Sequence, residues 1–199
     1  AAIEAALLDL MGQHLNLPVA ELLASGRQRD RVPVLGYLFY IADRNLTSMN
    51  YQAGQSGGDA WLQLRHEKAM DAQGVVRLAE AAAERYGFRD FKLKGGVHHG
   101  EVEVETVNAL LQRFPQARVT VDPNASWSLD EAISYGKQLA GRTPYLEDPC
   151  GAERGYSGRE TLAEFTRATC IPVATNITST VCRPFRHALQ PKSIYYTLP

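Results

Sequence analysis

The sequences Phe-Lys-Leu-Lys-Gly-Gly at 91–96 and Val-Asp-Pro-Asn at 121–124 decide how this chain is expected to fold. Each begins as a short apolar strand, ends in polar residues and is followed by a helical pattern. Leu-Glu-Asp-Pro at 146–149 and Ala-Thr-Asn at 174–176 end two further strands in the same way. Strands that alternate with helices of this length predict a parallel sheet joined by right-handed crossovers.

A (β/α) barrel and a doubly wound sheet both satisfy this alternation. The polar residues favour the barrel, because they recur at the C-terminal ends of successive strands, where a barrel carries its active site. A dinucleotide-binding sheet would carry Gly-x-Gly-x-x-Gly after its first strand, and that motif does not occur there. We count about six strands, so the α/β fold expected is a partial barrel of the TIM type, about two strands short of the usual eight.

Apolar spacing predicts elements on both sides of these strands. Residues 2–14 are expected to form a helix and residues 32–40 a strand. The polar stretch 42–59 is expected to be a long surface loop, and 66–86 a helix. The remaining helices are expected at 101–114, 128–139, 157–168 and 183–189, and the remaining strands at 88–94, 118–121, 144–146, 171–174 and 193–196. Ser128 precedes Glu131 by three residues, which predicts a capping box.

Composition narrows the classes of function. Of 199 residues, 45% are hydrophobic and 22% charged, as in ordinary globular proteins, and the net charge is −1. Without a basic stripe, a long apolar segment or a signal-like N-terminus, we expect no nucleic-acid partner, no membrane and a cytoplasmic location. Cys150, Cys170 and Cys182 are widely spaced and lack a CxxC motif, so we expect reduced thiols.

Lys92 and Lys94 are two residues apart on a predicted strand, so their side chains share one face. If that face is the barrel interior, like-charge repulsion and burial lower a lysine pKa, and one lysine becomes a usable base near neutral pH. The alternative is a strand end in water with two solvated lysines. His98 and His99 follow in the next loop; they could approach the site, but we expect them to be exposed.

Oxygen-bearing side chains end the three strands that follow. They are Asp122, then Glu147 with Asp148, then Asn176, and Glu153 lies a few residues further along a loop. Oxygen ligands without His or Cys suit Mg²⁺, which keeps open positions for substrate oxygens. Each residue alone could instead cap the helix that follows, but that reading does not explain the whole series beside the lysine pair.

Together these motifs resemble the enolase superfamily, and in particular its glucarate dehydratase-like branch. The closest phrases are Leu-Gly-Tyr-Leu-Phe at 35–39, Phe-Lys-Leu-Lys-Gly-Gly-Val at 91–97 and Glu-Asp-Pro-Cys-Gly-Ala-Glu at 147–153. The likeness extends from the first helix to about Asn176. It implies a carbon–oxygen lyase that dehydrates glucarate or a similar acid sugar.

The resemblance also implies roles for single residues. Lys94 matches the base that removes the proton α to the substrate carboxylate, and Lys92 matches the lysine that contacts this carboxylate. Asp122 and Asn176 match Mg²⁺ ligands, and the remaining acidic ligand matches either Glu147 or Glu153. The positions implied to contact substrate are Tyr37, Lys92, Asp122, Asn124 and Asn176.

The same resemblance implies that residues 1–26 end a capping-domain region and that 27–199 form an incomplete barrel domain. Both ends of the sequence look cut. The family's catalytic His on a later strand, with its Asp partner, has no match in the sequence. We therefore expect this polypeptide alone to fold poorly or to be inactive as a dehydratase.

Two other functions stay open. An acid-sugar epimerase or racemase would keep the same metal site but lose no water. A non-catalytic glucarate dehydratase-related partner would pair with a full-length paralogue through an open sheet edge. A homo-oligomer is the other assembly that we consider.

Overall fold

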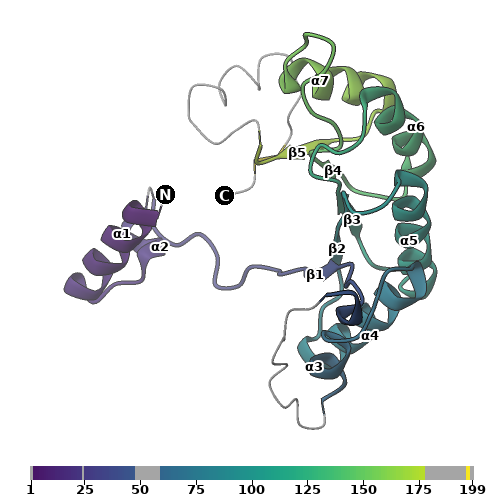
Figure 1. Cartoon of the computed structure of the whole chain (residues 1–199). Helices are drawn as coiled ribbons and strands as arrows, with labels where there is room; N and C mark the ends of the chain where they lie inside the picture. Colours follow the sequence, from purple (N-terminus) through teal and green to yellow (C-terminus); the bar gives the residue numbers. More distant parts are fainter. Residues whose placement is uncertain (1, 24, 48–58, 178–195, 198–199) are drawn as a thin grey trace. The chain divides into compact units, whose positions relative to one another are not determined.

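The computed structural model describes residues 2–23, 25–47, 59–177 and 196–197 (Figure 1). The chain divides into two compact units, Ala1–Val34 and Leu35–Pro199. The larger unit contains all the strands of the described residues and all the residues expected to carry chemistry. The assignment of residues 1–26 to a capping-domain region stays a prediction.

The smaller unit is a pair of helices, α1 (Ala2–Leu15) and α2 (Val19–Leu22). The turn between them is tight, because the Leu17 amide donates to the Gly12 carbonyl at 2.9 Å. A side chain at Gly12 would meet the Leu17 carbonyl oxygen at 2.8 Å, so only glycine fits there. Ile3 and Leu10 of α1 remain more than half exposed.

Six short strands in the described residues form two parallel three-stranded sheets, each in chain order. The first sheet contains β1 (Gly36–Phe39), β2 (Phe91–Lys94) and β3 (Val119–Asp122); the second contains β4 (Leu146–Glu147), β5 (Val173–Thr175) and β6 (Tyr196–Thr197). The register places Phe39 beside Lys94 and Lys94 beside Asp122. The carboxyl ends of the first three strands therefore meet in one row.

Threonine side chains connect the two sheets. The Thr120 hydroxyl donates to the Tyr145 carbonyl at 2.6 Å, and the Thr143 hydroxyl donates to the Val119 carbonyl at 2.8 Å. These bonds hold β3 beside β4, so the strands β1 to β5 follow one another along an arc (Figure 1). This continuity brings the ends of β3 and β4 together.

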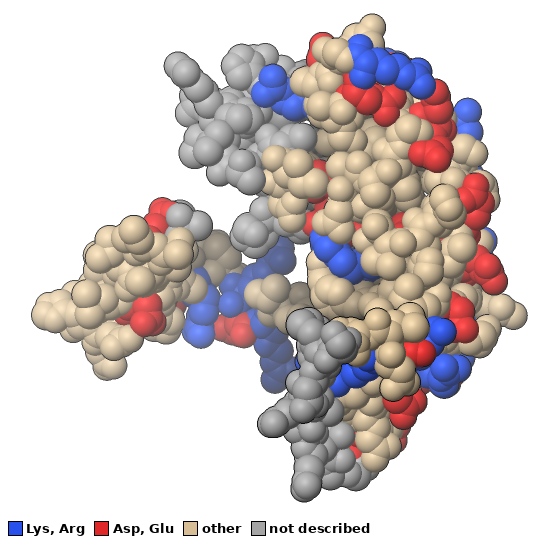
Figure 2. Space-filling model, in the orientation of Figure 1, with Lys and Arg blue, Asp and Glu red and all other residues tan. Residues whose placement is uncertain are grey.

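Helices cover the outer face of the strands. They are α4 (Ala72–Tyr86), α5 (Gly100–Arg113), α6 (Leu129–Leu139) and α7 (Gly158–Thr169), as Figure 1 shows. Phe91, Leu93 and Phe165 are fully buried in the core between helices and strands. A side chain at Gly136 would meet Phe165 at 2.8 Å, so α6 and α7 approach closely. Over these outer helices, acidic and basic side chains alternate in small groups (Figure 2).

The helix expected at 66–86 is shorter than predicted and begins at Ala72. Ala69 pairs with Ile41 in an antiparallel bridge, which requires extended backbone at this point. The Asp71 side chain then accepts from the Gly74 amide at 2.7 Å and starts α4. A separate short helix, α3 (Ala60–Leu64), lies before the bridge.

The strand expected at 32–40 covers only Gly36–Phe39, because Val32 and Val34 are exposed and pair with no strand among the described residues. The loop expected at 42–59 contains a short 3-10 helix, η1 (Arg44–Leu46), and its residues 48–58 lie outside the described residues. The helix expected at 183–189 also lies outside them, as does Cys182. In the described part of the chain, no helix combines the length and apolar character needed to cross a membrane.

The capping box predicted at the start of α6 is confirmed. The Glu131 amide donates to the Ser128 hydroxyl, and the Glu131 carboxylate accepts from the Ser128 amide at 2.8 Å. We expect Ser128→Ala to lower the free energy of unfolding by about 1 kcal/mol, because an amide at the helix start loses its acceptor. Urea denaturation measures this change. Ser134→Ala, on the exposed face of the same helix, is the control; equal losses in both variants would contradict the prediction.

Candidate active site

The ends of β2, β3 and β4 bring two lysines against two carboxylates. The Lys94 ammonium donates to Asp122 Oδ2 at 2.6 Å. Lys92 Nζ lies 3.3 Å from the same oxygen and donates to Glu147 Oε2. Lys92 is therefore held between carboxylates from two neighbouring strands. Its side chain is 7% exposed, whereas that of Lys94 is 25% exposed.

These contacts decide the charge of Lys92. Burial lowers the pKa of the Lys92 ammonium, but the hydrogen-bonded Glu147 and the nearby Asp122 outweigh burial and raise this pKa above its usual value. The expectation that repulsion and burial lower a lysine pKa here is therefore wrong for Lys92. Each lysine ammonium donates directly to a carboxylate, so the two lysines are not simply solvated at a strand end.

Three buried acidic residues form one group at this point: Asp122, Glu147 and Asp148, with oxygens within 4.8 Å of one another. Burial opposes the charge of Asp122, but hydrogen bonds from Lys94 and Asn124 outweigh it and lower the pKa of Asp122. Burial raises the pKa of Glu147, and Lys92 only partly offsets it. Burial therefore disfavours the charged form of Glu147 more than Lys92 stabilises it. A further positive charge beside Glu147 would be favourable.

Asp148 and Asn176 connect β4 to the end of β5. Asp148 Oδ1 accepts from the Thr175 hydroxyl at 2.5 Å, and Oδ2 accepts from the Asn176 and Ile177 amides at 3.1 and 3.3 Å. Both oxygens of Asp148 are therefore occupied by protein donors. The Asn176 side-chain amide lies 3.4 Å from Glu147 Oε1, so Asn176 faces the carboxylate group.

This donor set fits a divalent cation. Asp122, Glu147 and Asn176 contribute oxygen-bearing side chains from three successive strand ends, and hard cations such as Mg²⁺ and Ca²⁺ prefer oxygen. The three carboxylates outnumber the two ammonium groups beside them. A cation would therefore enter a site with an excess of buried negative charge. The metal-binding character predicted at these strand ends matches the observed group.

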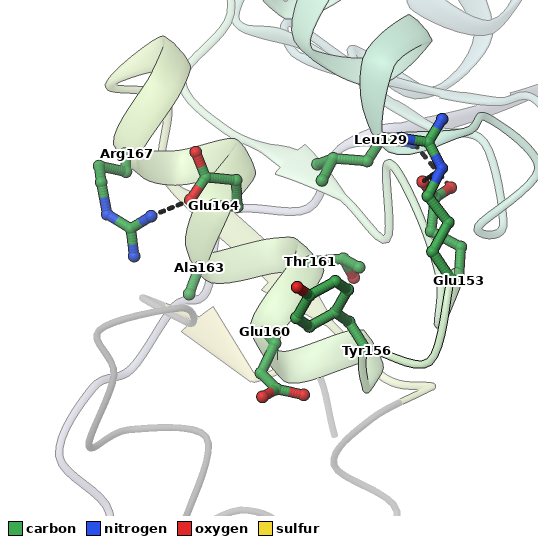
Figure 3. A pocket seen from close by; sticks show the side chains of 9 residues that line it. Leu129, Glu153, Tyr156, Glu160, Thr161, Ala163, Glu164 and Arg167 are labelled. Carbon is green, nitrogen blue, oxygen red and sulfur yellow. Dashed lines mark hydrogen bonds and ion pairs between the residues drawn. The ribbon is translucent and has the colours of Figure 1, made fainter.

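Glu153 is not part of this group. Its Oε2 accepts from the Leu129 amide at 3.0 Å, at the first residue of α6, and its Oε1 lies 3.6 Å from Arg154. Glu153 instead lines a cavity of about 490 Å³ beside α7, together with Leu129, Tyr156 and Glu160 (Figure 3). The structure thus brings Glu147 to Asp122 and gives Glu153 a helix-capping contact.

Tyr37 and Asn124, the remaining predicted positions, flank the lysines. The Tyr37 ring centre lies 5.0 Å from Lys92 Nζ, within reach of a cation–π contact. Asn124 has left-handed backbone (φ 54°); its amide donates to Asp122 Oδ1 at 3.0 Å, and its side chain donates to the Gly95 carbonyl at 3.4 Å. Both side chains are exposed, Tyr37 from within β1 and Asn124 just after β3, where a ligand could contact them.

The other candidates lie outside this arrangement. His99 is exposed as expected, but His98 is half-buried and packs edge-on against Tyr40, with ring centres 4.6 Å apart. Cys150 and Cys170 are free thiols, as predicted. Sequence reasoning missed Glu103, whose carboxylate is fully buried under the loop after Lys94. A Glu in the first turn of a helix usually interacts with the helix dipole at the surface, so its pattern gave no sign of burial.

The comparisons with known proteins agree with the fold. A family model described as enolase C-terminal domain-like matches residues 74–199. A probable glucarate dehydratase of Streptomyces coelicolor is 36% identical over the whole chain, which spans 42% of that protein. This chain therefore belongs to the enolase superfamily, as a portion of its C-terminal (β/α) barrel.

Two crystal structures of enolase-superfamily proteins are also similar. One, from Thermobispora bispora in complex with magnesium and formate, is 34% identical with a TM-score of 0.79. The other, from Pseudomonas fluorescens with bound magnesium, potassium and tartrate, is 33% identical, also with a TM-score of 0.79. Each match covers 100% of this chain and 42% of the other protein. These matches confirm the predicted partial barrel.

The buried position of Lys92 predicts a large effect on stability. We expect Lys92→Met to lower the free energy of unfolding by about 3–5 kcal/mol, because Glu147 and Asp122 lose the cation that offsets their buried charge. Urea denaturation without added metal measures the loss. Lys137→Met, on the exposed face of α6, is the control, and we expect it to change stability by less than about 0.5 kcal/mol. A comparable loss in both variants would contradict the prediction.

Proposed function

We propose that this chain carries the metal- and base-bearing part of a hydro-lyase that acts on acid sugars, with glucarate as the first substrate to test. One observation supports this proposal most directly. Lys94, the more accessible lysine, lies 2.6 Å from Asp122 in a group of three buried carboxylates. A base beside a cation site is the arrangement needed to remove a proton next to a carboxylate.

The proposed role of Lys94 follows from its position. Lys94 ends β2 with a quarter of its side chain exposed, whereas Lys92 is enclosed by Glu147 and Asp122. In the proposed step an unprotonated Lys94 Nζ accepts the α-proton, and the electron pair of the broken C–H bond moves toward the substrate carboxylate. The electron pair then forms the double bond between the α- and β-carbons as the β C–O bond breaks, and the hydroxyl leaves as water with a proton taken from solvent.

Lys92 is proposed to hold the substrate carboxylate rather than the α-proton. Its raised pKa keeps it charged, so it offers a fixed positive charge in a poorly hydrated site. Tyr37 lies against the same ammonium. Together with Asn124, these side chains would orient a polyhydroxylated acid above the strand ends.

The proposed metal is Mg²⁺, held by Asp122, Glu147 and Asn176. When bound, it supplies positive charge where a second negative charge develops on the substrate carboxylate. Magnesium in the two similar crystal structures supports this choice. The helix-capping contact of Glu153 favours Glu147 as the acidic ligand. Asp148 is proposed to orient Asn176 through its backbone amide.

The substrate class rests on similarity to the probable glucarate dehydratase. Because the chain spans less than half of that relative, the activity of the whole protein, its assembly and a cytoplasmic location remain proposals. An epimerase would share the first proton transfer but return a proton to the α-carbon without losing water. The mass of the product separates the two reactions.

The first test is exchange of the glucarate α-proton in deuterium oxide with Mg²⁺, followed by proton NMR. We expect exchange that is lost in Lys94→Ala, because Lys94 is the base in the proposed step. Lys137→Ala keeps all the site residues and should exchange like the unaltered chain. If neither the unaltered chain nor Lys94→Ala exchanges the proton, the proposed activity of this chain is wrong.

A second test decides between the two acidic ligands. We expect Glu147→Gln to weaken Mg²⁺ binding by about tenfold or more in calorimetry, since one charged ligand is lost. Glu153→Gln should bind Mg²⁺ like the unaltered chain and lose only stability, through its contact with the start of α6. The reverse pattern would show that Glu153 is the ligand.

A further inference from the structure

Glu103 of α5 is a charged residue whose surroundings the proposed reaction does not explain. Its side chain has no exposed surface, although it lies near the start of the helix. Its Oε1 accepts from the Val97 amide at 3.1 Å and from the His98 amide at 3.3 Å. The carboxylate therefore lies under the loop 95–99, which follows Lys94 directly.

The two glycines of this loop are explained by the same packing. A side chain at Gly95 would lie 2.9 Å from Glu103 Cδ and 3.1 Å from its Oε1, so the carboxylate leaves room only for glycine. Gly96 has a φ of +78°, and a side chain there would meet the Pro123 carbonyl oxygen at 2.5 Å. Contact with Glu103 therefore requires glycine at position 95, and the left-handed backbone requires glycine at position 96.

The Gly95 backbone connects Glu103 to the site. The Gly95 amide donates to the Asp122 carbonyl at 2.9 Å. The Gly95 carbonyl accepts from the Asn124 side chain at 3.4 Å. A shift of this peptide would therefore move the backbone next to Lys94 and release the Asn124 side chain.

A second contact holds the other side of the loop to the same helix. His98 packs edge-on against Tyr40, whose hydroxyl donates to the Thr106 hydroxyl of α5 at 2.9 Å. His98 Nε2 and Glu103 Oε2 are both buried without a hydrogen-bond partner among the described residues. The loop is thus fixed to α5 directly through Glu103 and indirectly through Tyr40, around buried polar atoms that lack a partner among the described residues.

Keeping a carboxylate in this place is costly. Burial raises the pKa of Glu103, and the amides of His98, Val97 and Gly96 act against it. Hydrogen bonds from backbone amides to a charged acceptor are stronger than those between neutral groups. A buried charge rarely increases net stability. The burial of Glu103 is therefore better explained by its effect on the order of the loop 95–99.

We propose that Glu103 is a positioning residue, which fixes the loop 95–99 and thereby orients Lys94 and Asn124 relative to Asp122. The inference deepens the proposed function, because it takes Lys94 and Asn124 as site residues. Glu103 itself does not touch the substrate in this arrangement. Its effect passes through the Gly95 peptide.

The test compares Glu103→Gln with Glu105→Gln by NMR of the full chain without metal. Glu105 is exposed on the same helix and loses the same charge. In Glu103→Gln we expect the Val97 and His98 amides to exchange with solvent about tenfold faster. This corresponds to a decrease of about 1.4 kcal/mol in the free energy of local opening. We also expect the Asn124 side-chain amide resonances to shift. Neither change is expected in Glu105→Gln.

Gly95→Ala provides a second route to the same result if Glu103→Gln folds poorly. Its added methyl group displaces the carboxylate, so we expect faster Val97 and His98 exchange and the same Asn124 shift. Unchanged exchange in a folded Glu103→Gln or Gly95→Ala chain would overturn the inference. Faster exchange with unmoved Asn124 resonances would also overturn it, because the effect would then stop at the loop.

These measurements are independent of turnover, so they separate the inference from the proposed function. If the unaltered chain neither binds Mg²⁺ nor exchanges the glucarate proton, the proposed function fails, while the NMR comparison still judges Glu103. Where the chain does exchange the proton, Glu103→Gln should lower the maximal rate about tenfold with little change in KM. An unchanged maximal rate would overturn the positioning role.

Discussion

The contact of Lys92 with Glu147 and Asp122 is the interaction on which the rest of the site depends. It joins β2, β3 and β4 where two sheets meet, and it places a buried cation between two buried anions. Neither charge could remain at this depth alone, because the cost of burying an unpaired ion is several kcal/mol. The contact of Lys92 with the two carboxylates therefore fixes the strand ends relative to one another. Lys94 and Asn176 lie around it.

Around that pair, the chain uses carboxylates in two distinct ways. Asp122 and Glu147 face the lysines and the space where a cation would bind, whereas Asp148 and Glu103 accept from backbone amides of the loops after β5 and β2. All four side chains are carboxylates, so the role of each is decided by its surroundings. A carboxylate that accepts from loop amides and contacts neither lysine is a structural element of the loop, even where it lies within reach of a metal site.

The sequence predicted the alternation of strands and helices and the strand-end position of Lys94 and Asp122, because these follow from local pattern. It overestimated the helix at 66–86, since the bridge of Ala69 to Ile41 that keeps the backbone before Asp71 extended is a tertiary contact. It overestimated the strand at 32–40, since strand pairing with β2 begins only at Gly36. It could not separate Glu147 from Glu153, because the contact that occupies Glu153 comes from α6. The burial of Glu103 likewise depends on the loop folding over it.

The parallel register of β2 and β3 has a consequence for how such a site changes over evolutionary time. Lys94 lies beside Asp122 because each residue of one strand has a fixed partner on the next. Insertions and deletions in the outer helices or in the loops before the strands leave this partnership intact. A slip of one residue within β2 would instead turn Leu93 toward the position of Lys94. Length variation is therefore better tolerated in the outer helices and in the loops before the strands than inside strands only two to four residues long.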